Sequence, residues 1–143
     1  MTKTGKIISL FYSTLNARTP TTELKLDDQG ILKDKHYGKN VERSVLLTSL
    51  DSYKLVSSHG IDVDHGALGE NLLIDYNPYR LSTGTRLKIG TVILEISIHC
   101  TLCKSLTKVD AKLPKLLKED RGIFAKVVES GVIKENDNIY LLD

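Results

Sequence analysis

The protein has 143 residues and a mass of 15.9 kDa, a usual length for one domain, so we expect a single domain over residues 1–143. Apolar residues make up 41% of the sequence and charged residues 27%, which excludes intrinsic disorder for most of the chain. We expect a cytoplasmic protein with no nucleic-acid or membrane partner. The net charge is only +2, there is no Trp, cysteines are few, and no apolar run is long enough to span a membrane.

Short segments with alternating or β-branched side chains predict a mainly β protein. In chain order, the predicted strands are residues 5–11, 22–26, 44–48, 86–89, 91–98, 123–129 and 139–142. The clearest is 91–98, whose inward side chains are Val92, Leu94, Ile96 and Ile98. Many short strands at close spacing favour a β-barrel or a curved, sandwich-like sheet. The polar, proline-containing residues 14–22 predict a mobile loop.

Two helical segments are predicted among these strands. Ser49 is placed to cap a helix that begins at Leu50, and Gly60 is placed to end it. The second segment runs from residue 103 to about residue 119, with an interruption at Pro114 because proline breaks the helical hydrogen-bond ladder. Its apolar stripe is Leu102, Leu106, Val109, Leu113, Leu116 and Leu117.

Cys100 and Cys103 form a C-x-x-C pair between the best strand and the second helix. A thiolate at Cys103 gains from the helix dipole and from Lys104, which makes it the more reactive thiol. Cys100 continues the inward face of the strand and should be slower. Other interpretations are a pair of small buried hydrophobic residues, half of a zinc site, or a redox pair, although a redox pair favours a βαβ chain that this sequence lacks.

Three further segments contain candidate anion-binding residues. Residues 30–43 place Lys35, His36 and Arg43 between two predicted strands, with Asp34 placed to orient His36. Glu70 and Asn71 follow two glycines and lead into a strand, and Arg121 precedes another strand. The alternative for each segment is an ordinary one: a solvated charged loop, polar side chains that satisfy loop backbone groups, and a surface arginine.

The order of these segments is more specific than any one of them. From about residue 5 to the C-terminus the sequence resembles the MOSC domain, which occurs at the C-terminus of eukaryotic molybdenum cofactor sulfurases and as small stand-alone bacterial proteins. The positions that match its motifs are Asp34, His36, Arg43, Gly69, Glu70, Asn71, Cys103, Arg121, Gly122 and Gly131.

The resemblance implies a β-barrel with a few peripheral helices, and a protein that carries sulfur or handles the molybdenum cofactor (molybdopterin). It makes Cys103 the predicted catalytic residue, which holds sulfur as a persulfide, and the predicted metal ligand. The predicted cofactor-binding residues are Lys35, His36, Arg43, Glu70, Asn71 and Arg121. Pyridoxal phosphate binding is a further association of the family.

The resemblance leaves other functions open. Some relatives are molybdenum-dependent reductases of N-hydroxylated compounds, and a chain of this size would then need an electron-donor partner. The third function is a non-catalytic module that presents the cofactor to another protein. The implied partners are a cysteine desulfurase-type sulfur donor, a molybdoenzyme or a cofactor-biosynthesis protein. The sequence therefore leaves open whether the chain is a sulfur transferase, a molybdenum-dependent oxidoreductase or no enzyme.

Overall fold

The computed structural model describes residues 1–100, 104–107 and 109–142, and among these residues strands dominate. Seven described strands close into a mixed barrel in the order β11-β7-β8-β9-β5-β6-β1, and a pairing of β1 with β11 completes the ring. They are β1 (Thr2–Ser13), β5 (Val45–Ser49), β6 (Leu72–Ile74), β7 (Arg86–Ile89), β8 (Val92–His99), β9 (Ile123–Glu129) and β11 (Asn138–Leu141). Strands β5 and β6 run parallel, and the other barrel pairs are antiparallel.

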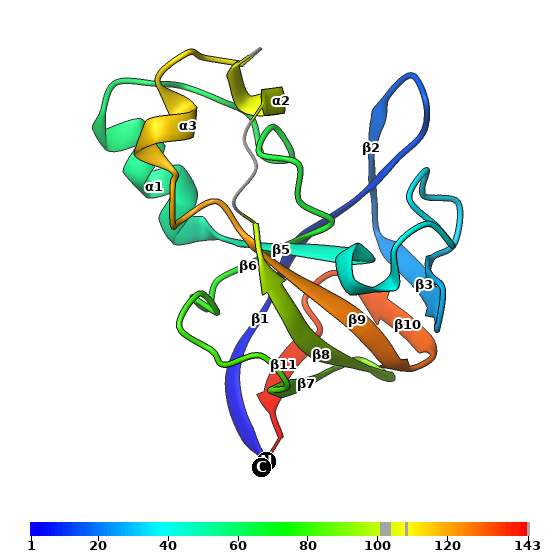
Figure 1. Ribbon diagram of the computed structural model, residues 1–143. Helices are drawn as coiled ribbons and strands as arrows, with labels where there is room; N and C mark the ends of the chain where they lie inside the picture. The colour runs from blue at the N-terminus through cyan, green and yellow to red at the C-terminus, as the bar shows by residue number, and fades with distance from the viewer. Residues whose placement is uncertain (101–103, 108, 143) are drawn as a thin grey trace.

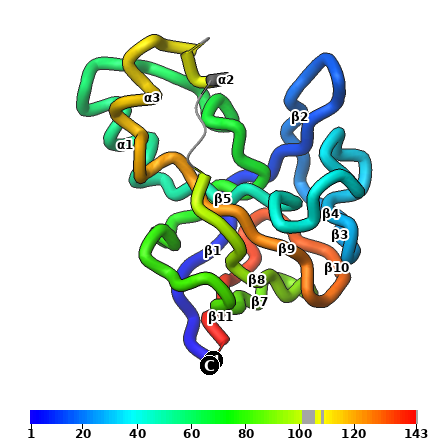
Figure 2. Tube along the Cα trace, viewed as in Figure 1, coloured from blue at the N-terminus to red at the C-terminus, as the bar shows by residue number. Residues whose placement is uncertain are grey.

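The remaining elements extend or cover this barrel. Strand β2 (Arg18–Thr21) pairs with the end of β1, and a second sheet contains β10 (Gly131–Lys134), β3 (Glu23–Asp27) and β4 (Gly30–Ile31). The helices α1 (Leu50–Ser58), α2 (Lys104–Thr107) and α3 (Leu113–Leu116) gather at one end of the barrel, and both termini meet at the other end (Figure 1). Figure 2 follows the chain through these elements in the same view and labels β4. A short 3-10 helix, η1 (Val41–Arg43), precedes β5.

The predicted β-barrel with peripheral helices is therefore confirmed. The barrel interior holds the larger apolar cluster, to which every barrel strand contributes, and a second cluster lies beneath the helices. No helix among the described residues is long and apolar enough to cross a membrane.

The predicted buried face of residues 91–98 is confirmed for three of its four members. Val92, Leu94 and Ile96 are at most 1% exposed. Ile98 is only half-buried, and Ser97 is buried in its place. A register shift between Ile96 and Ile98 causes this change, because the irregularity interrupts the alternation along β8. The hydroxyl of Ser97 donates a hydrogen bond to the carbonyl oxygen of Glu42.

The prediction for residues 14–22 is wrong in part. Residues 18–21 form β2, which pairs with β1 in the register Ser13 to Arg18 and Leu10 to Thr21. The strand is short and polar, so its own pattern does not predict it. It forms because the extended end of β1 offers an edge to pair with.

The helix predictions are confirmed in position and corrected in detail. Ser49 caps α1 by accepting a hydrogen bond from the N–H of Asp51. Among the described residues, outside which Leu102 and Cys103 lie, the second helical segment is two short helices. Pro114 lies in the first turn of α3 instead of interrupting a longer helix. Proline is tolerated there because the first turn needs no N–H donor. Val109 is 44% exposed, so it does not belong to the apolar stripe.

Candidate functional site

A cavity of about 520 Å³ opens at the helical end of the barrel, where β8 ends and β9 begins. We call it the cationic cavity. The residues that line it are Ser13, Arg18, Lys35, His36, Arg43, Leu46, Ala67, Gly69, Asn71, Cys100, Arg121 and Phe124. Among these described lining residues there is no Asp or Glu. The structure thus brings together five predicted site residues from separate parts of the sequence: Lys35, His36, Arg43, Asn71 and Arg121. Cys103 lies outside the described residues.

His36 is positioned by the buried carboxylate of Asp34. Oδ2 of Asp34 accepts hydrogen bonds from the backbone N–H of His36 at 2.9 Å and from its Nδ1 at 3.1 Å, and Oδ1 accepts one from the N–H of Ser13 at 2.7 Å. Burial acts to raise the pKa of Asp34, but the hydrogen bonds from His36 and Ser13 outweigh it, so this pKa lies below its ordinary value. Asp34 is therefore an ionised anchor that ties the cationic loop to β1.

Arg43 is exposed at the end of η1. Its guanidinium carbon lies 5.5 Å from the centre of the Phe124 ring, a cation–π distance. Asn40 begins η1 by accepting a hydrogen bond from the N–H of Glu42. The ring and the capped helix hold a cation at the cavity while leaving it open to a ligand.

Arg121 is buried, with 8% of its surface exposed. Its Nε donates to the carbonyl oxygen of Leu68 at 3.1 Å, and its own carbonyl oxygen accepts from the hydroxyl of Thr48 at 2.8 Å. A Cβ added at Gly69 would lie 3.1 Å from Nη2 of Arg121, and Gly69 has a φ of +93°. Glycine suits position 69 because L side chains rarely adopt this φ, and a Cβ there would push the Arg121 guanidinium from its place.

Asn71 and Glu70 hold the cavity wall together. Oδ1 of Asn71 accepts from the N–H of Leu46 at 3.0 Å, and its Nδ2 donates to the carbonyl oxygen of Phe11 at 3.2 Å. Glu70 is completely buried and does not line the cavity. Its Oε2 accepts from the hydroxyl of Tyr53 at 2.6 Å and from the N–H of Gly66 at 3.0 Å. The structure thus places the Glu70 carboxylate behind the turn that it stabilises.

Arg18 is a lining residue that the sequence analysis missed. Its Nη1 donates to the hydroxyl of Ser13 at 2.6 Å, and its Nη2 donates to the carbonyl oxygen of Glu70. Burial lowers the pKa of Arg18, although the negative charges of Glu70 and Asp34 oppose this shift. Only the pairing of β2 with β1 brings Arg18 to the cavity, and no local motif marks this residue.

Cys100 is buried as expected, with 7% of its surface exposed, and it lines the cationic cavity. Its backbone N–H donates to the carbonyl oxygen of Gly122 at 3.1 Å, which extends the pairing of β8 with β9 by one residue. Within the described residues, no group of three or more His, Cys, Asp or Glu side chains is arranged to hold a metal ion.

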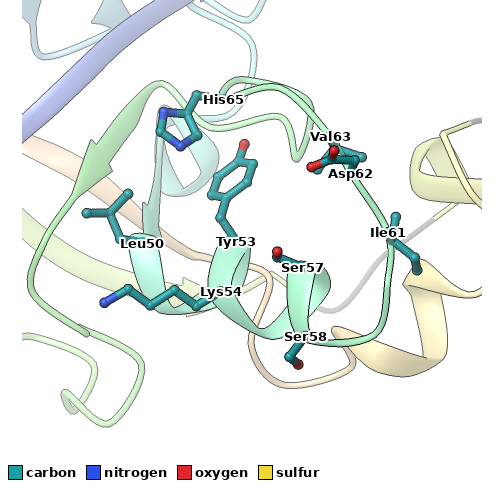
Figure 3. A pocket seen from close by; sticks show the side chains of 9 residues that line it. All are labelled: Leu50, Tyr53, Lys54, Ser57, Ser58, Ile61, Asp62, Val63 and His65. Carbon is teal, nitrogen blue, oxygen red and sulfur yellow. The ribbon is translucent and has the colours of Figure 1, made fainter.

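A separate pocket of about 530 Å³ lies between α1 and residues 61–65 (Figure 3). The rings of Tyr53 and His65 meet edge to face there, with their centres 4.9 Å apart. The Tyr53 hydroxyl accepts hydrogen bonds from the N–H groups of Gly66 and Leu68. Tyr53 thus links this outer pocket to the 66–71 turn of the cationic cavity.

Comparisons with known proteins agree with this architecture. The family model described as MOSC domain matches residues 33–140. The crystal structure of the YuaD protein from Bacillus subtilis is similar, with a TM-score of 0.83 and 17% identity over 95% of this chain and 94% of that chain. YiiM from Geobacillus stearothermophilus has a TM-score of 0.79 and 17% identity, over 97% of this chain and 75% of that chain.

YiiM from Escherichia coli is also similar, with a TM-score of 0.75 and 15% identity over 96% of this chain and 70% of that chain. A comparison with curated proteins gave no match. At these identities the solved structures establish a shared fold.

Proposed function

Because the chain belongs to the MOSC domain family, we propose that it binds the molybdenum cofactor in the cationic cavity and carries sulfur as a persulfide on Cys103. One observation carries the proposal. Four cations, Arg18, Lys35, Arg43 and Arg121, reach one cavity from three separate segments, together with His36. The buried carboxylates of Asp34 and Glu70 offset part of this positive charge, and an anionic ligand would offset the rest.

The lining residues fit the chemistry of this cofactor. The cofactor has a terminal phosphate, a pterin ring with donors and acceptors, and a metal held by sulfur. Planar arginine side chains suit the phosphate, and about 520 Å³ lies in the usual range for cofactor pockets. Arg121 and Arg18 would hold the anion from the wall, whereas Lys35 and Arg43 would close on it from exposed positions.

The neighbouring polar groups would set the orientation of the ligand. Since Nδ1 of His36 is bonded to Asp34, Nε2 is the ring nitrogen that is available to a ligand. Asn71 and Glu70 would act indirectly, because their side chains are bonded to the cavity wall. When bound, the cofactor supplies a metal centre that exchanges oxygen or sulfur ligands.

The sulfur-carrier part of the proposal depends on the sequence position of Cys103 beside Lys104, at the start of α2. A basic neighbour lowers the pKa of a thiol and raises its reactivity towards sulfane sulfur. Its partners would be a cysteine desulfurase-type donor on one side and a molybdoenzyme or cofactor-biosynthesis protein on the other. Reduction of N-hydroxylated compounds stays a second prediction, which an assay with a hydroxylamine and a reductant would test.

The test measures pterin and molybdenum in protein purified from a host that makes the cofactor. We expect both in the purified protein, and less of both in Arg43→Gln, whereas Arg86→Gln is a control because Arg86 lies outside the cavity. Mass spectrometry should find a persulfide on Cys103 that is absent in Cys103→Ser. Protein without pterin from such a host, or equal pterin in the Arg43 and Arg86 variants, would contradict cofactor binding in this cavity.

A further inference from the structure

A second cavity, of about 360 Å³, lies beside the first and shares one lining residue with it, Cys100. Its walls come from the segment after β6, from the end of β8 and from the segment between α3 and β9. Its ionisable lining residues besides Cys100 and the buried Tyr79 are Arg80, His99, Lys118, Glu119 and Asp120. Cys100 thus stands between two cavities of different character.

The second cavity contains both signs of charge, whereas the lining of the cationic cavity has cations alone among its charged residues. The side chains of Arg80, Lys118, Glu119 and Asp120 make no hydrogen bond or ion pair with any described residue. Arg80, Lys118 and Glu119 are exposed and Asp120 is half-buried, so both signs of charge are open to a ligand that has an anionic and a cationic group.

We propose that the second cavity binds an amino-acid persulfide, such as cysteine persulfide, and that Cys100 receives its outer sulfur. The α-carboxylate of the ligand would face Arg80 and Lys118, and its α-ammonium would face Glu119 and Asp120. A volume of about 360 Å³ suits a molecule of this size. The inference rests on the proposed sulfur-carrier function, and it adds a small-molecule donor to the protein donor proposed above.

The chemical step is a transfer of sulfane sulfur between thiols. The deprotonated sulfur of Cys100 attacks the outer sulfur of the donor, a new S–S bond forms on Cys100, and the S–S bond of the donor breaks. The donor leaves as a thiolate and takes up a proton. No external oxidant is needed, because the donor already holds the oxidised sulfur.

The experiment uses the full chain as Cys103→Ser, in which Cys100 is the one remaining thiol. The probes are cysteine persulfide and the persulfide of N-acetylcysteine methyl ester, which has neither charge. Alkylation followed by mass spectrometry measures the rate at which Cys100 gains sulfur. We expect the charged donor to react faster, and Arg80→Gln or Lys118→Gln to slow it by about fivefold, as loss of one partly exposed ion pair does.

Lys115→Gln is the matched control, because Lys115 is an exposed lysine of α3 that does not line the cavity. The uncharged donor should react at one rate with all these variants, which also shows that each variant is folded. Equal rates for the two donors, or equal slowing by the Lys115 and Lys118 variants, would overturn the proposal. Sulfur on Cys103 in Cys100→Ser, together with no sulfur on Cys100 in Cys103→Ser, would overturn this proposal but leave the proposed function intact. Sulfur on neither cysteine would refute both.

Discussion

A single carboxylate oxygen, Oδ2 of Asp34, accepts two hydrogen bonds from His36, one from the backbone N–H and one from Nδ1. Asp34 is buried, whereas the His36 side chain is 57% exposed at the cationic cavity. A fixed anion thus sets the orientation of a ring that faces solvent and ligand. The same carboxylate joins this loop to β1 through the N–H of Ser13.

Replacement of Asp34 by Asn should remove this anchor. At neutral pH we expect Asp34→Asn to lose about 1.5–3 kcal/mol in the free energy of unfolding, as for hydrogen bonds to a charged group. The pKa of Asp34 is lowered in the fold, so its stabilisation is full above the ordinary value near about pH 4 and is lost as the pH falls through the lower folded value.

Urea unfolding of both proteins across acid pH would measure this effect. The difference in unfolding free energy between wild type and Asp34→Asn should shrink in acid, and Asp28→Asn, at an exposed carboxylate, should show no such convergence. A constant difference from neutral to strongly acid pH would show that the charge of Asp34 is not what stabilises the loop.

The contact of Gly69 with Arg121 allows a test with a matched glycine. Gly69 and Gly84 have φ values of +93° and +94°, but a Cβ at Gly84 would meet nothing within 4 Å. Both alanine variants should lose about 1–2 kcal/mol of stability to backbone strain. Only Gly69→Ala should also displace the Arg121 guanidinium.

Thermal unfolding at increasing inorganic phosphate should then show a smaller phosphate-dependent rise in Tm for Gly69→Ala than for Gly84→Ala. An equal rise would separate Arg121 from anion binding.

Sequence pattern predicted the elements whose own residues decide their structure. Residues 91–98 alternate because one face packs in the barrel, and Ser49 caps α1 through a local hydrogen bond. Arg18 was missed because β2 owes its structure to the pairing with β1, which lies outside any local window. The inward direction of Glu70 follows from the turn at Gly66 and Gly69, both of positive φ, and from the distant Tyr53 hydroxyl.

Tyr53 should be a main support of the wall of the cationic cavity. Its hydroxyl donates to Glu70 and accepts from two N–H groups, so Tyr53→Phe should cost about 1–3 kcal/mol through the groups left unpaired. Burial and the nearby charge of Glu70 raise its pKa, and burial raises the pKa of Tyr79 to about 12.

The sign of this shift gives an alkaline prediction. A tyrosine with a raised folded pKa stabilises fully below its ordinary pKa near about 10, and this stabilisation is lost as the pH rises further. Wild type should therefore lose stability above about pH 10, and Tyr53→Phe should lose less. Tyr12→Phe is the control, because the Tyr12 hydroxyl has no hydrogen-bond partner among the described residues. Parallel alkaline curves for wild type and Tyr53→Phe would contradict this account.

The charge of the cationic cavity should be detectable at Cys100 itself. Cys100 is buried but lines this cavity together with Arg43 and Arg121, so an anionic thiol reagent should be concentrated near its sulfur.

In Cys103→Ser, the rate of alkylation by iodoacetate relative to neutral iodoacetamide should exceed the ratio for free cysteine. Because Arg43 is exposed to solvent, the ratio should fall as salt rises from about 0.01 M to about 1 M, over which the screening length shortens from about 30 Å to about 3 Å. Arg43→Gln should lower the ratio at low salt, whereas Arg86→Gln, outside the cavity, should leave it unchanged. A ratio equal to that of free cysteine and independent of salt would mean that the cations do not act on a ligand beside Cys100, and the anion-binding role of the cavity would be wrong.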